Sequence, residues 1–214
     1  MHKIFKILIS VSLLSFSLNV NADGVLIPAP NRIDMAHDLA RNLVYISNGA
    51  EVLRYDVAAG SFLSSYNPGG TLSGMDISPD GNTLAVADRT RSETEVWVHL
   101  IDLNSDVSRK VIFPRAFYEG GTFTVSFGAD GALLISSTFE GSGWVPLRKY
   151  DPASDTYSVI GSVRQNTMLS ASADANVIAY AESNISSGPI GRYNVISQLL
   201  EKGPGTGWFN FEIG

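Results

Sequence analysis

The sequence predicts an all-β protein built from repeated four-stranded units, and three observations support this prediction. Two short motifs recur along the chain, each at a spacing of between 42 and 50 residues. Turn-forming residues such as Asp-Gly separate short apolar runs, and no apolar stripe at helical spacing is long enough for a helix. The chain has no cysteine, so core packing and strand hydrogen bonds have to stabilise it without disulfides.

The first 22 residues have the pattern of a secretory signal peptide. Lys3 and Lys6 form a basic start, and the apolar run Ile7–Leu18 is too short to cross a bilayer comfortably. Val20-Asn21-Ala22 follows as a small-x-small cleavage site. We therefore predict cleavage after Ala22 and export to the periplasm, the cell surface or the medium. The alternative is an uncleaved N-terminal anchor.

The charge of the mature chain limits its partners. The signal segment contains two of the 15 basic residues and none of the 21 acidic ones, so the net charge after cleavage is −8. An acidic exported protein is poorly suited to bind nucleic acid or anionic lipid. No later apolar run approaches the length of about 20 residues that a membrane helix needs. We expect no nucleic-acid partner and, after cleavage, no membrane association.

The first repeated motif is an apolar residue, a turn and an apolar strand. Its clearest copy is Ile77–Val86, in which Ser-Pro-Asp-Gly-Asn forms the turn. Four copies begin at Met35, Ile77, Phe127 and Ala171. The second motif is an aromatic or apolar residue followed by Asp or Asn at the end of a strand. Its acidic or amide residues are Asp56, Asp102, Asp151 and Asn194.

Two motifs in step with a period in the mid-forties predict the blades of a β-propeller. In the second unit we expect strand A to end at Ile77, strand B over Thr83–Ala87, strand C over Glu95–Asp102 and strand D over Val107–Phe113. A β-sandwich also has short strands, but it does not repeat a whole four-strand unit. The predicted units span residues 31–72, 73–120, 121–166 and 167–207, with the start of a fifth at 208–214.

These motifs resemble a known repeat family. Tyr45-Ile46-Ser47-Asn48 resembles the Tyr-Val-Thr-Asn (YVTN) motif of one β-propeller repeat family. Ile77–Leu84 is similar to the turn of that family and of lactonase-like and quinoprotein-like propellers. The resemblance implies a propeller over nearly all of residues 30–213. The motifs are structural, so they specify the fold much better than the activity.

The last residues suggest an incomplete propeller. Trp208–Ile213 resembles the strand A that ends at Ile77, and Ile213 follows Ala171 in register. We expect four four-stranded antiparallel blades plus the first strand of a fifth, with self-association through the open blade faces. The alternative is a closed four-bladed ring in which this strand, or Val25–Ile27, completes a sheet.

No catalytic or metal-binding motif stands out, and we predict no cofactor. His37 and His99 fall in different strands, so a structural role is expected for both. Asp102–Asp106 resembles the start of a calcium loop, but Val107 and Phe113 replace its Gly and Glu. We interpret this segment as the turn between strands C and D.

The loops between strands B and C are the most variable part of the repeat. Propeller topology brings them to one rim together with the D–A loops, and arginines and aromatic residues on such a rim favour binding. The candidate rim residues are Arg89, Arg91, Arg115, Tyr118, Glu140 and Trp144. The alternative is ordinary variable loops with locally paired charges, such as Arg91 with Glu93.

The function predicted from this pattern is a non-enzymatic binding or scaffolding module that holds a protein or peptide on one rim. The rival is a lactonase-like or quinoprotein-like enzyme, which needs polar groups converging on the central channel. Asp76 and Glu212 would contribute to such a site only if their side chains point inward. A third possibility is a fragment that has no function of its own.

Overall fold

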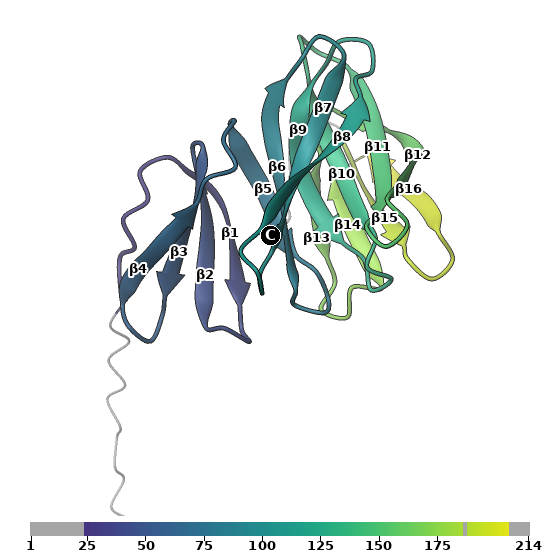
Figure 1. The fold of residues 1–214 in the computed structure, drawn as a ribbon. Helices are drawn as coiled ribbons and strands as arrows, with labels where there is room; N and C mark the ends of the chain where they lie inside the picture. Colours follow the sequence, from purple (N-terminus) through teal and green to yellow (C-terminus); the bar gives the residue numbers. More distant parts are fainter. Residues whose placement is uncertain (1–23, 186–187, 206–214) are drawn as a thin grey trace, which may run out of the picture.

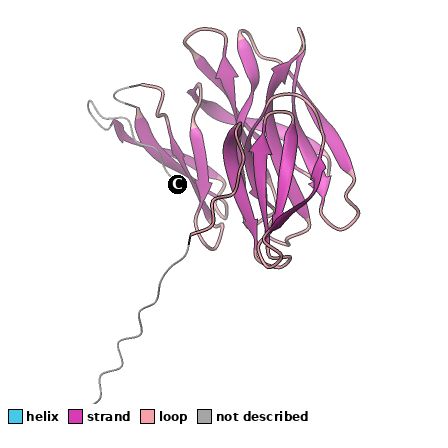
Figure 2. Cartoon of the chain, turned by 90° about the vertical axis from the view of Figure 1, so that its left-hand side faces the viewer, coloured by secondary structure: helices cyan, strands magenta, loops and turns pink. Residues whose placement is uncertain are grey.

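The computed structural model describes residues 24–185 and 188–205, which form sixteen β-strands and no helix (Figures 1 and 2). None of the described residues therefore belongs to a helix that could cross a membrane. The predicted signal peptide, residues 1–22, and the predicted fifth-blade strand, residues 208–213, lie outside the described residues.

The strands form four antiparallel sheets of four strands each, and each sheet follows the sequence order. Blade 1 comprises β1 (Arg32–Asp38), β2 (Leu43–Asn48), β3 (Glu51–Asp56) and β4 (Ser61–Tyr66). Blade 2 comprises β5 (Leu72–Ile77), β6 (Thr83–Arg91), β7 (Glu95–Asp102) and β8 (Ser108–Pro114). Blade 3 comprises β9 (Glu119–Phe127), β10 (Leu133–Phe139), β11 (Trp144–Asp151) and β12 (Thr156–Arg164). Blade 4 comprises β13 (Met168–Ala171), β14 (Val177–Ala181), β15 (Pro189–Asn194) and β16 (Leu199–Gly205).

The hydrophobic core consists of three clusters, one at each junction between successive blades. Blades 1 and 2 share a cluster that includes Tyr45 and Leu84, and blades 2 and 3 share one that includes Val98 and Leu133. The third cluster, which includes Leu147, joins blades 3 and 4. Each sheet is therefore apolar on the faces that meet a neighbouring blade, as blades arranged around an axis require.

The inner strands of neighbouring blades approach one another very closely. A Cβ atom at Gly121, on β9, would lie 2.2 Å from the carbonyl carbon of Arg89 on β6. A Cβ atom at Gly74, on β5, would lie 2.8 Å from the Cα atom of Thr124. Only glycine fits at such distances, so these two residues allow blade 2 to pack tightly against blade 3.

The turns follow the chemistry that the repeat predicts. Gly81 and Gly131 adopt φ values of 71° and 77° in the A–B turns, and Ala175 adopts 53° at the same position in blade 4. The Asp80 carboxylate accepts a hydrogen bond from the Asn82 backbone N–H at 3.1 Å. The local sequence therefore determines where each hairpin reverses.

Two details differ from the expected unit boundaries. β5 begins at Leu72 and β9 at Glu119, one and two residues before the predicted units start. In β5 an irregularity between Leu72 and Met75 lets the strand continue towards the rim. By contrast, β7 has the same bounds, Glu95–Asp102, as the strand C expected there.

The four blades do not form a closed ring within the described residues. Blades 1 and 4 lie at opposite ends of the array (Figure 1), and no strand of one packs along a strand of the other. The segment Val25–Ile27 forms no strand, so the alternative in which this segment completes a sheet is wrong. It lies instead beside the outer face of blade 1.

Candidate functional site

Three loops from two blades meet on one rim of the propeller. The Arg115 backbone N–H, at the start of the β8–β9 loop, donates to the Thr94 carbonyl in the β6–β7 loop at 2.8 Å. The Glu140 N–H, in the β10–β11 loop, donates to the Tyr118 carbonyl at 2.8 Å. Strand pairing thus brings B–C and D–A loops together. We call the following residues the rim surface: Arg91, Arg115, Phe117, Tyr118, Glu140 and Trp144.

Glu140 lies between two arginines from blade 2. One carboxylate oxygen contacts the guanidinium of Arg91, and the other accepts from Arg115 Nη2 at 2.7 Å. Two more hydrogen bonds position the Arg115 side chain. Its Nε donates to the Glu119 carbonyl at 2.5 Å, and its Nη1 donates to the Glu93 carbonyl at 3.2 Å. Arg91 therefore pairs with Glu140 on the next blade, and the pair with Glu93 named in the alternative interpretation is not formed among the described residues.

A buried ion pair lies beneath this surface. Glu119 and Arg148 are both almost fully buried, and their side chains make two contacts, one of 2.8 Å from Arg148 Nη2 to Glu119 Oε2. Arg148 Nη2 also donates to the Pro114 carbonyl at 2.9 Å, and the Ala116 N–H donates to Glu119 at 2.8 Å. A buried bidentate pair with these added bonds fixes the β8–β9 loop in one conformation.

Exposed aromatic rings surround the charged cluster. Tyr118 has a φ of 53° and stacks on Phe139 at a ring distance of 6.0 Å. Phe117 is 86% exposed and meets Tyr118 edge-on at 4.4 Å. Trp144 is 57% exposed, and the Arg164 guanidinium lies 4.8 Å from its ring centre. Large aromatic rings are among the side chains that most often anchor a partner at an interface.

Arg89 is the one predicted rim residue that stands apart from this cluster. It is exposed near the end of β6, and its backbone N–H donates to the Thr71 carbonyl at 2.8 Å. Its side chain joins none of the ion pairs described above.

The neighbouring Asp88 organises the interior of blade 2. Its carboxylate accepts from Trp97 Nε1 at 2.7 Å and from the Thr71 N–H at 2.8 Å, and it lies 2.9 Å from His99 Nε2. Burial alone would raise the pKa of Asp88, but hydrogen bonds, led by the one with His99, lower it below its ordinary range. His99 is thus a buried structural partner, whereas His37 lies exposed on β1.

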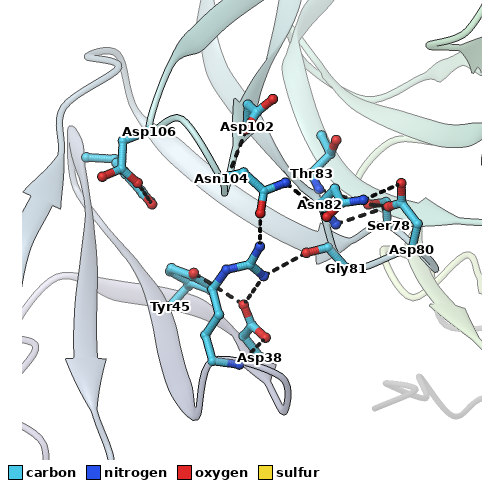
Figure 3. Close-up of polar contacts among 12 residues, drawn as sticks. Asp38, Tyr45, Ser78, Asp80, Gly81, Asn82, Thr83, Asp102, Asn104 and Asp106 are labelled. Carbon is cyan, nitrogen blue, oxygen red and sulfur yellow. Dashed lines mark hydrogen bonds and ion pairs between the residues drawn. The ribbon is translucent and has the colours of Figure 1, made fainter.

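The opposite rim carries the segment that resembles a calcium loop (Figure 3). The two Arg41 guanidinium nitrogens donate to Asp38 at 2.9 Å, to the Gly81 carbonyl at 2.8 Å and to Asn104 Oδ1 at 2.7 Å. Asp102 accepts from the Asn104 N–H at 2.9 Å. The loop oxygens are used by protein donors, which supports its interpretation as a turn.

This arrangement joins blade 1 to blade 2. Arg41 comes from the β1–β2 turn, and its partners Gly81 and Asn104 belong to two turns of blade 2 (Figure 3).

Across 24–185 and 188–205, no group of three or more histidine or acidic side chains is arranged to hold a metal ion.

The central channel contains two carboxylates. A cavity of about 580 Å³ is lined by the inner strands of all four blades, including Asp34 on β1 and Asp76 on β5. Asp34 Oδ2 accepts from the Met75 N–H at 2.9 Å, and Asp76 Oδ2 accepts from the Phe127 N–H at 2.7 Å. Each aspartate thereby bonds the inner strand of the next blade.

Burial changes the ionisation of both channel groups. It raises the pKa of Asp34, and it raises the pKa of Asp76 to about 6 against the opposing hydrogen bonds from Phe127 and Ile77. The negative charge of Asp34 adds to the shift at Asp76. Asp76 was expected at the channel only if its side chain points inward, and it does line the cavity. Asp34 was not expected there, and Glu212 lies outside the described residues.

A sequence signal for the channel carboxylates was present. Asp34 and Asp76 directly precede the opening apolar residues Met35 and Ile77 of the first motif, and serines 126 and 170 occupy that place in the next two copies. The strand register does not preserve this correspondence in blade 1: Met35 pairs with Ile46 as Met75 pairs with Val86, so Asp34 takes the place of Gly74 and not that of Asp76. Only the inward register of the strands gives this pattern a chemical meaning.

The sequence matches no protein-family model, and no curated protein is significantly similar to it. Solved structures, in contrast, share its fold. Hydrazine synthase of Kuenenia stuttgartiensis superposes with a TM-score of 0.65 at 12% identity over 88% of this chain and 53% of that chain. An auxiliary nutrient binding protein of Bacteroides ovatus gives 0.64 at 15% identity over 86% and 44%, respectively.

A putative 6-phosphogluconolactonase of Bacteroides uniformis superposes with a TM-score of 0.58 at 12% identity over 80% of this chain and 53% of that chain. The chain thus spans about half the length, or less, of these three structures. At such low identity the likeness concerns the fold and not the activity. Together with the four sheets and the junction cores, it identifies the chain as a β-propeller protein.

Proposed function

We propose that this protein is an exported binding module that holds a protein or peptide partner on its rim surface. The observation that carries the proposal is the set of exposed aromatic rings on a base fixed by the buried ion pair of Glu119 and Arg148. Binding to such a surface loses little conformational entropy because the loops are already ordered.

The chemistry of the rim surface favours a particular kind of partner. Arg91 and Arg115 share the single carboxylate of Glu140, so the cluster keeps an excess of positive charge on an acidic protein. Phe117 and Trp144 offer apolar area beside it. A peptide with apolar side chains next to a carboxylate matches both features.

Other findings agree with this proposal. The residue pattern of positions 1–22 favours export. Similar folds occur in proteins described as auxiliary nutrient binding proteins and in the extracellular domain of a protein described as a putative hybrid two-component system of Bacteroides thetaiotaomicron. We also propose that the blades belong to the Tyr-Val-Thr-Asn repeat family, on the basis of Tyr45-Ile46-Ser47-Asn48 in β2.

A peptide-selection experiment tests the rim surface. A phage-displayed random peptide library is panned on the purified protein, and selected peptides are measured by fluorescence polarisation. We expect Phe117→Ala combined with Trp144→Ala to weaken binding at least about tenfold, because both rings are exposed anchors. Leu39→Ala is the matched control, since Leu39 is 82% exposed in the β1–β2 turn of the other rim. Equal binding by the double variant would refute the proposal.

A second candidate is hydrolysis in the central channel. The cavity of about 580 Å³ contains Asp76, whose pKa of about 6 suits a general base near neutral pH. A panel of lactones is incubated with the wild type and with Asp76→Asn, and acid release is followed by titration. This candidate predicts a rate that rises through about pH 6 and is lost in the variant. Rates equal to those of buffer alone would eliminate it.

A further inference from the structure

The two outer blades carry, on their open faces, the residue pattern that is buried at the internal junctions. In blade 2, Met75 pairs with Val86 across the strands, and both are buried against blade 1. The same strand register in blade 1 pairs Met35 with Ile46. Met35 is 72% exposed where its equivalent Met75 is 6% exposed. The outer face of blade 1 is thus a receiving face that no described strand covers.

Blade 4 has the complementary face. Val52, Val98 and Leu147 occupy one equivalent position in blades 1 to 3, and each is 0% exposed at a junction with the following blade. The register of β14 and β15 assigns Ile190 to that position in blade 4, where it is 36% exposed. The outer face of blade 4 also includes Val177. Arg192 lies on the same face, and its Nε forms an ion pair with Glu201 Oε2 at 2.5 Å.

We propose that two copies of this chain assemble about a two-fold axis into one eight-bladed ring. The outer face of blade 4 in each copy packs on the outer face of blade 1 in the other. Both halves of this junction are present on the same chain, and the internal junctions repeat the same packing three times. Assembly that stops at two requires the four blades of each copy to turn through half of the ring, because a head-to-tail contact that does not close gives a filament instead.

The available area is sufficient for a stable dimer. A six-residue strand is about 20 Å long and four strands span about 19 Å, so one blade face measures about 380 Å². Two junctions bury four such faces, about 1,500 Å², which is the size of a standard stable interface. A hollow of about 450 Å³ on this face is lined by Val44 and Ile46 and also by Val25 and Ile27 of the N-terminal segment. Side chains from blade 4 would enter it beside that segment.

The charges on the two faces allow this burial. Arg192 and Glu201 neutralise each other, and Arg32 on blade 1 donates to the Ala29 carbonyl at 3.2 Å. Asp34, at the inner edge, accepts from the Met75 N–H. Docking therefore buries one neutralised ion pair, and it leaves Arg32 and Asp34 each with a backbone hydrogen-bond partner.

Sedimentation velocity over a range of concentrations tests the ring. We expect the wild type to reach twice the monomer mass and no more. Met35→Glu and Ile190→Glu should each remain monomeric at concentrations where the wild type is dimeric, because each introduces a charge on one face. Leu39→Glu, in an exposed turn outside both faces, should dimerise like the wild type. Circular dichroism and thermal unfolding of each variant confirm that it is folded.

Mixing the two monomeric variants distinguishes this geometry from any other dimer. An equimolar mixture of Met35→Glu and Ile190→Glu retains one intact junction and should form a heterodimer that neither variant forms alone. A wild type that is monomeric at every concentration would overturn the proposal. Loss of the dimer in Met35→Glu but not in Ile190→Glu would also overturn it, since it would indicate contact between two copies of blade 1.

Discussion

The ionisation of Asp76 leads to a test of how the channel affects stability. Burial raises the pKa of this carboxyl from an ordinary value of 3.8 to about 6 in the folded protein. Between these two values the folded chain binds more protons than the unfolded chain, so the free energy of unfolding decreases as the pH rises. Acidification from about pH 7.5 to about pH 5 should therefore strengthen the fold through this group.

The size of the effect follows from the two pKa values. With a folded pKa of about 6 and an unfolded value of 3.8, the contribution of Asp76 over this pH change is about 1.4 kcal/mol. Asp76→Asn removes the titration. It also places an amide donor near the N–H groups of Phe127 and Ile77, which costs about 1 to 3 kcal/mol at both pH values.

Urea unfolding followed by tryptophan fluorescence at both pH values measures the prediction. The loss of stability caused by Asp76→Asn should be larger at about pH 5 than at about pH 7.5, by about 1.4 kcal/mol. Asp174→Asn is the control and should keep the wild-type pH response, since hydrogen bonds from Ser172 and Asn176 hold the pKa of Asp174 at about 2. An identical pH response in the wild type and Asp76→Asn would refute the reasoning.

Three further changes test the packing. Ala175→Gly should stabilise the protein by about 0.5 to 1 kcal/mol in urea unfolding, because residue 175 has a φ of 53° that glycine adopts without strain. Arg41→Ala should cost about 2 kcal/mol in the same assay, because it removes three hydrogen bonds, two of which reach blade 2. Glu119→Gln should cost about 3 to 5 kcal/mol and lower the melting temperature in calorimetry, because Arg148 loses its buried counter-charge. Glu140→Gln, on the half-exposed rim, should have a much smaller effect.

Local chemistry explains why so much of the fold could be predicted. A hairpin is specified by neighbouring residues: Asp80 and Gly81 fix the turn, and the apolar residues on either side fix the strands. Strand C of blade 2 accordingly has the predicted bounds Glu95–Asp102. Strand B, predicted over Thr83–Ala87, instead continues to Arg91, because irregular pairing between Ala87 and Arg91 extends the strand beyond the regular pattern.

The candidate site could be predicted only in part. Topology indicated which loops share a rim, but not which side chains meet there. Arg91 has Glu93 two residues away, yet its partner is Glu140 on the next blade. The buried support of the rim by Glu119 and Arg148 carried no signal either, since neither residue belongs to a repeated motif.

The sequence by itself determined the strands, the turns and their repetition, because each depends on residues that are close together along the chain. Only the tertiary structure decided what happens between blades. It brought Asp34 and Asp76 into one channel, and it left Met35 and Ile190 on open faces. The physical reason is that burial, pKa and pairing depend on neighbours 25 to 51 residues apart, whose identity follows from how the blades pack around the axis.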